Sequence, residues 1–140
     1  MSYQFANNQM SMNQTSSFGL SPNVAALVSY IWIPVTSILV LATEKENRLV
    51  RFHAWQSVFL GLSCFAASII LSSVIGIVML VAGLVSPYAG ILVSILSLVV
   101  WLVVAAAMLG VWVLCLVKAY QGAMHRLPLI GNYAEKMANK

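Results

Sequence analysis

Residues 43–57, TEKENRLVRFHAWQS, form a short charged segment between two long apolar runs. Five of the chain's ten charged residues lie here: Glu44, Lys45, Glu46, Arg48 and Arg51. The other five lie at or beyond the end of the last apolar run, and residues 54–117 carry no charge. This separation of charged from apolar sequence predicts membrane-embedded segments that are joined and ended by segments in water.

The composition excludes an ordinary water-soluble domain. Of the 140 residues 61% are hydrophobic and 7% are charged, and the mean hydropathy is +0.94. Soluble domains carry about 25% charged and about 45–50% apolar residues. The net charge of +4 comes from few residues, which flank apolar segments. That pattern favours contact with an anionic membrane surface and argues against nucleic-acid binding.

The first apolar run covers residues 24–42, after a helix start at Ser21-Pro22. As one helix it would be about 28 Å long, close to a hydrocarbon core of about 30 Å. Pro34 lies near its middle and should kink it, which makes Pro34 a candidate hinge. The carbonyl that Pro34 frees, on Tyr30, would then be satisfied by a hydroxyl, water or a neighbouring helix.

Two further spans follow the charged segment. Residues 54–85 would form a helix of about 48 Å, so we expect it to tilt, protrude or bend near residues 72–76. Residues 86–90, SPYAG, predict a five-residue turn before the third span at 91–117.

These runs predict an all-α integral membrane protein, a compact bundle of three transmembrane helices with a short C-terminal interfacial helix. A four-span alternative splits residues 54–117 into three crossings but lacks another helix breaker. With three spans, every Lys and Arg falls on one side, as the positive-inside rule requires. We therefore expect a disordered tail at residues 1–20 and one membrane domain at 21–140, with the charged segment and residues 118–140 in the cytoplasm.

Small residues predict where the spans pack, because they let helix backbones approach closely in lipid. They recur every three or four positions along the second span and again on the third. The same pattern suits a contact within the bundle or a homo-oligomer, and both stay open. The candidate packing residues are Ser57, Gly61, Cys64, Ser68, Ala106 and Gly110, with Ser72, Gly76, Gly90, Ser94 and Ser97 continuing the same two stripes.

Capping patterns predict the remaining helix ends. Thr43 and Glu46 have the spacing of a capping box, so the second long helix should begin between residues 43 and 48. Gly122 suits a left-handed cap after Gln121. Residues 127–131, LPLIG, should be non-helical and either lie on the headgroup region or plug the cytoplasmic mouth of the bundle. Asn132 with Glu135 predicts the cap of the last helix.

The order of motifs resembles a known family. The chain contains SPN-x-AALxSY, then EKENRxVRFHAxQS, and after the apolar runs KAYQG, LPLIG and AEK. This resembles small bacterial membrane proteins related to the Tic-type import component of the chloroplast inner envelope. The resemblance implies a bundle of three or four membrane helices without known enzymatic activity. Its plastid relatives contribute to protein import, and its magnetosome-membrane relatives help to shape a mineral-bearing vesicle.

The two polar segments supply the candidate site. In the three-span arrangement the start of the second helix and the end of the third share one face, where several cations would suit a phosphate or an acidic partner. The simpler interpretation is that these charges only set the orientation. The candidate lipid- or partner-binding residues are Arg48, Arg51, His53, Gln56, Lys118, Tyr120, Gln121 and Arg126.

We expect neither catalysis nor a cofactor. Two histidines and three glutamates spread over both polar segments fall short of a metal site. No carboxylate lies inside an apolar run, which argues against a proton-coupled transporter, and no Ser-His-Asp or Cys-His arrangement is placed for hydrolysis.

The expected function is that of a non-enzymatic protein of the bacterial cytoplasmic membrane. Its cytoplasmic face, residues 43–57 and 118–136, would dock a protein partner or anionic lipid in a membrane-organising or assembly role, with self-association or a membrane protein partner. The alternative is a subunit of a protein-translocation or channel complex, with Pro34 and the small-residue stripes lining the route.

Overall fold

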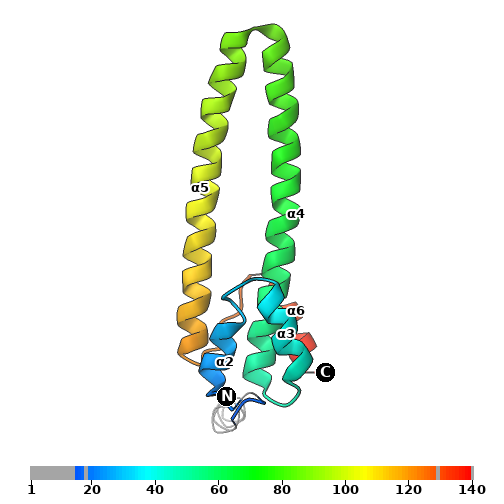
Figure 1. Ribbon diagram of the computed structural model, residues 1–140, viewed down its shortest axis with the longest axis vertical. Helices are drawn as coiled ribbons and strands as arrows, with labels where there is room; N and C mark the ends of the chain where they lie inside the picture. The colour runs from blue at the N-terminus through cyan, green and yellow to red at the C-terminus, as the bar shows by residue number, and fades with distance from the viewer. Residues whose placement is uncertain (1–14, 18, 129, 140) are drawn as a thin grey trace. The chain divides into compact units, whose positions relative to one another are not determined.

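The structure, a computed structural model, describes residues 15–17, 19–128 and 130–139, and these contain helices and no strand (Figure 1). Of the tail expected to be disordered, residues 1–14 and 18 lie outside this range, while residues 15–17, 19 and 20 lie within it. The chain forms two compact units: unit 1 is Met1–Leu62 with Trp112–Lys140, and unit 2 is Ser63–Val111. The helices are α2 (Pro22–Val28), α3 (Val35–Thr43), α4 (Arg48–Val85), α5 (Pro87–Tyr120) and α6 (Ile130–Ala138).

Two of the three expected spans lie in long helices. α4 has 38 residues and α5 has 34, which gives about 57 Å and about 51 Å at 1.5 Å per residue. Among the described residues these are the two helices long and apolar enough to cross a bilayer. α4 runs unbroken through residues 72–76.

The turn between α4 and α5 is shorter than expected. It consists of Ser86 alone, and α5 already begins at Pro87. The Ser86 hydroxyl accepts the backbone N–H of Ala89 at 3.1 Å, while Pro87 occupies the first helical position, where its missing N–H is harmless. Ser-Pro therefore starts a helix here and does not open a five-residue loop.

Unit 2 contains one segment of α4 and one of α5, which run side by side (Figure 1). Within residues 64–75 and 94–108 the half-buried positions are spaced alternately by four and three residues, the spacing that keeps one side of a helix facing its partner. Ser72 and Gly76 lie outside this set and are exposed, so their part in packing stays a prediction. Repeated steps of four drift about 40° each around a helix of 3.6 residues per turn. The half-buried positions are Cys64, Ser68, Leu71 and Ile75 on α4, and Ser94, Ser97, Trp101, Val104 and Met108 on α5.

The first expected span does not form one kinked helix. α2 has 7 residues and α3 has 9, about 10 Å and about 14 Å at 1.5 Å per residue. Residues 29–34 separate them, and Pro34 precedes α3 as its N-cap. The Ile33–Pro34 peptide is cis. A bundle of three transmembrane helices is not confirmed, because this run forms two short helices, the first ending at Val28 and the second beginning after Pro34.

The described residues of unit 1 form two small apolar cores. The first joins α2, α3 and the start of α4 through Ala25, Val40, Val50 and Ala54. The second joins α4 to α6, where Phe52 packs against Ala134 and Ala138, with Trp55, Phe59 and Met124 around them. The expected last helix exists, but it begins at Ile130, so Asn132 lies inside it and does not cap it.

α5 ends as its sequence predicts. Gly122 has a φ of 68°, a left-handed conformation that glycine adopts without steric cost. The N–H of Ala123 donates to Lys118 O and the N–H of Gly122 donates to Ala119 O, both at 3.0 Å. These two bonds are those of a Schellman motif.

Gly61 provides a test of the packing in unit 1. A Cβ atom at this position would lie 2.6 Å from Cγ2 of Ile33 and 3.6 Å from Cβ of Pro34, whereas a Cβ atom at Gly76 would meet nothing within 4 Å. Gly61→Ala should therefore lower the free energy of unfolding by about 1–3 kcal/mol. Gly76→Ala should leave it unchanged or raise it slightly. Thermal unfolding of both variants in detergent measures the difference, and equal melting temperatures would contradict the packing described.

Candidate functional site

The charged segment is built around Glu44, which is buried although it is ionisable. Its carboxylate accepts the N–H and the hydroxyl of Ser17 at 2.7 and 3.1 Å. It also accepts the N–H groups of Glu46 at 3.2 Å and Asn47 at 3.0 Å. Burial by itself raises the pKa of Glu44, but these hydrogen bonds outweigh it and hold the pKa below its ordinary value.

Asn47 is the cap of α4, in place of the expected Thr43. Its side-chain oxygen accepts the N–H groups of Leu49 at 3.1 Å and Val50 at 3.3 Å, which satisfies two donors of the first turn. Thr43 instead donates its hydroxyl back to Leu39 O within α3. The sequence contained the signal, since Asn is among the best N-cap residues and Asn47 directly precedes Arg48.

Two of the candidate arginines are paired with one carboxylate. Arg48 of α4 lies 3.1 Å from Glu135 of α6, and Arg126 lies 2.8 Å from the same oxygen atom. This ion triad joins the two polar segments of the sequence, as expected, but through a glutamate. The glycine at position 131 lets the start of α6 lie close to Arg126, because a Cβ atom there would lie 2.6 Å from Cα of Arg126.

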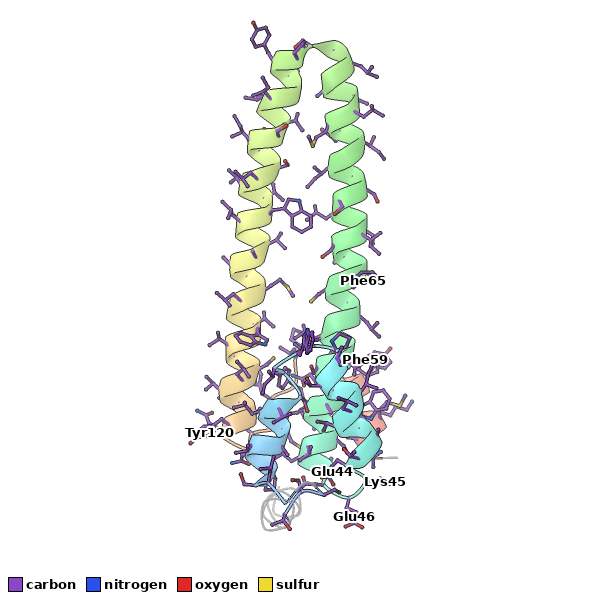
Figure 2. The ribbon with its side chains drawn as sticks, in the orientation of Figure 1. Glu44, Lys45, Glu46, Phe59, Phe65 and Tyr120 are labelled. Carbon is purple, nitrogen blue, oxygen red and sulfur yellow. The ribbon has the colours of Figure 1, made fainter. Side chains whose placement is uncertain are left out.

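Among the described residues, the partners of Arg51 and Lys118 are neutral groups. Arg51 donates to the carbonyls of Lys45 and Met137 at 3.4 and 3.5 Å, and Lys118 donates to the Gln121 side chain at 3.3 Å. These partners carry no negative charge. Tyr120 is exposed. In Figure 2, Tyr120, Glu44, Lys45 and Glu46 all lie below Phe59, at the lower end of unit 1.

His53 and Gln56 do not lie with these surface cations. Both are buried. The Tyr30 hydroxyl lies 3.2 Å from Nδ1 of His53, and Nε2 of Gln56 donates to the Cys115 sulfur at 4.0 Å. The structure thus divides the predicted site into a basic surface and a buried polar cluster, and sequence reasoning missed Tyr30 as a member of that cluster.

Hydroxyls hold the turn between α2 and α3 to α4. Ser37 and Ser57 both lie 2.8 Å from Ser29 O, and their hydroxyl oxygens are 2.7 Å apart. The N–H of the Trp112 side chain donates to Tyr30 O at 2.8 Å. The Tyr30 carbonyl is therefore satisfied by a neighbouring helix, one of the expected partners.

The proposed packing residues lie in varied surroundings. Ser57 and Gly61 contact the α2–α3 turn, and Cys64 and Ser68 line the unit 2 stripe, with the Cys64 sulfur 3.8 Å from that of Met108. Ala106 is exposed, and a Cβ atom at Gly110 would meet nothing within 4 Å. In the described part of the chain, no three His, Cys, Asp or Glu side chains gather as metal ligands would.

The sequence pattern of the magnetosome magnetite crystal formation protein family matches residues 15–134. The chain belongs to this family. The match agrees with the magnetosome part of the resemblance seen in the motifs, while the relation to the Tic-type import component and a bacterial origin stay predictions.

Relatives of this family member occur in archaea. The UPF0132 membrane protein MJ1443 of Methanocaldococcus jannaschii is 31% identical over 121 residues, 86% of this chain and 92% of that protein. A UPF0132 membrane protein of Archaeoglobus fulgidus is 33% identical over 118 residues, 84% of this chain and 95% of that protein. No solved structure matches the chain. The names of the relatives and the two long apolar helices identify this family member as a membrane protein.

Glu44 makes the stability of unit 1 depend on pH. Its pKa is lower in the folded than in the unfolded protein, so its hydrogen bonds contribute stability above the unfolded value of about 4.3. That contribution should be lost as the pH falls through the folded-state pKa. Glu44→Gln should melt lower than the unaltered protein at pH 7 and lose less stability between pH 5 and pH 3.

The matched control is Glu46→Gln, because Glu46 is exposed. It should melt like the unaltered protein over the whole pH range. Thermal unfolding at several pH values measures all three proteins, and identical pH profiles for the unaltered protein and Glu44→Gln would contradict the role assigned to Glu44.

Proposed function

We propose that this family member is a non-enzymatic integral membrane protein whose basic surface binds anionic lipid headgroups and thereby organises the membrane around it. The basic surface is formed by cations of residues 43–57 and 118–136, the two polar segments that unit 1 brings together. The positive-inside rule places this surface on the cytoplasmic face of the membrane, in a bacterium the cytoplasmic membrane.

The observation that carries the proposal is which groups the glutamate carboxylates bind. The chain has seven Lys and Arg and three Glu. Glu44 is taken up by backbone N–H groups and the Ser17 hydroxyl, and Glu135 is shared by Arg48 and Arg126. Arg51 and Lys118 have neutral partners, so their charge is available to a lipid phosphate. Each such cation near an anionic surface contributes about 1 kcal/mol.

The family description supplies the process in which such a role would fit, the formation of magnetite crystals in magnetosomes. A cationic surface on a membrane-embedded protein supports a role in which the protein acts on the surrounding lipid. The translocation or channel role stays a prediction, and so does self-association.

Lipid-dependent thermal unfolding tests the proposal. A ligand that binds only the folded protein raises its stability by mass action. Phosphatidylglycerol added to the protein in detergent should raise the melting temperature more than phosphatidylcholine does, and about 0.5 M salt should reduce the difference. In the double variant Arg51→Gln, Lys118→Gln the difference should fall by more than half.

Glu46→Gln serves as the control, since it changes one exposed charge of the same segment in the opposite direction. It should keep or enlarge the preference for phosphatidylglycerol. Equal shifts with both lipids in the unaltered protein would overturn the proposal.

A further inference from the structure

The two ends of the first apolar segment meet in unit 1. Ser17 lies just before α2 and Glu44 directly follows α3, yet the backbone N–H and hydroxyl of Ser17 lie 2.7 and 3.1 Å from the Glu44 carboxylate. The ends of a segment that crosses a bilayer lie on opposite sides of a hydrocarbon core about 30 Å thick. A hydrogen bond between the two ends is incompatible with such a crossing.

We propose that residues 22–43 form a re-entrant hairpin, which enters the leaflet nearest the charged segment and leaves it on the same side. The occupant of its exposed apolar face is the acyl region of that single leaflet. The chain then crosses the membrane twice, through α4 and α5. Residues before α2, the charged segment and the end of the chain share one side, and the turn at Ser86 lies on the other.

The length of the hairpin fits one leaflet. α2 and α3, of 7 and 9 residues, extend about 10 Å and about 14 Å, against about 15 Å for half of the hydrocarbon core. The tip of the hairpin lies at the same depth in the membrane, because Ile33 in the turn lies next to Gly61. Gly61 is ten residues beyond Arg51, about 15 Å along α4.

The surface of the hairpin suits lipid and not water. Residues 22–43 carry no charged side chain. Ile31 and Trp32, in the turn, are 61% and 70% exposed, and Val35, Ile38 and Leu39 continue the apolar surface along α3. Acyl chains cover such a face without the cost that water imposes.

The turn itself meets the condition for non-helical backbone inside a bilayer. Such backbone is tolerated only where its polar groups are satisfied by protein or water. Ser37 and Ser57 lie at hydrogen-bonding distance from Ser29 O, and Trp112 donates to Tyr30 O. The hydroxyl of Thr36 lies 3.2 Å from Trp32 O. Three carbonyls of the turn, those of residues 29, 30 and 32, thus have donors from the protein.

Labelling of single cysteines from each side of reconstituted vesicles tests the hairpin. Thr15→Cys, Glu46→Cys, Tyr88→Cys and Asn139→Cys are placed one at a time in a Cys64→Ala, Cys115→Ala background, since all four positions are exposed. A membrane-impermeant maleimide should reach positions 15, 46 and 139 from one side and position 88 from the other. Reaction of position 15 from the side of position 88 would show a true crossing and overturn the proposal, as would any other division of the four positions.

A second measurement keeps the test independent of the cysteine background. A fluorescent protein fused before residue 1 fluoresces if it stays in the cytoplasm, and it stays dark if the general secretory route exports it. A fluorescent fusion together with a cytoplasmic position 46 therefore supports the hairpin. A dark fusion with normal membrane abundance, together with a cytoplasmic position 46, overturns it. Neither measurement depends on lipid charge, so the hairpin can fail while the proposed lipid binding holds, and the reverse.

Discussion

The hydrogen bonds accepted by Glu44 tie together parts of unit 1 that the apolar sequence alone would leave free. They fix Ser17 before α2, the chain after α3 and the approach to α4 around one buried carboxylate. A buried carboxylate is costly unless several donors surround it. Four donors hold the Glu44 carboxylate in place. Because one of its partners is Ser17, residues 22–43 must leave and return to the same place.

The same requirement explains the rest of unit 1. A chain with so few charges and so much apolar surface must satisfy its backbone polar groups from within. Where helices are interrupted, the structure places Asn47 at the start of α4, Trp112 beside Tyr30 and two serines beside Ser29. At these interruptions, polar side chains supply the hydrogen bonds that the helix no longer provides.

Much of the fold could be predicted from the sequence. Composition predicts an all-helical protein, run length predicts α4 and α5, and Gly122 predicts the end of α5. Run length fails for residues 24–42, because a run of 19 apolar residues has the same composition whether it forms one helix or two short ones. The contact between Ser17 and Glu44, 27 positions apart, distinguishes two short helices from one long helix. The local periodicity of the sequence does not reveal such a long-range contact.

The candidate site shows the same limit. Charge clustering correctly brings residues 43–57 together with 118–136, since Arg48 and Arg126 meet at Glu135. It cannot tell which polar side chains turn inward. His53 lies two positions after Arg51 on α4, a rotation of about 200° around the helix, so it faces Tyr30 and the interior while Arg51 stays at the surface. The division between a buried cluster and a cationic surface therefore depends on helix rotation, and that rotation is set by the packing of Phe52 and Ala54 into the two cores.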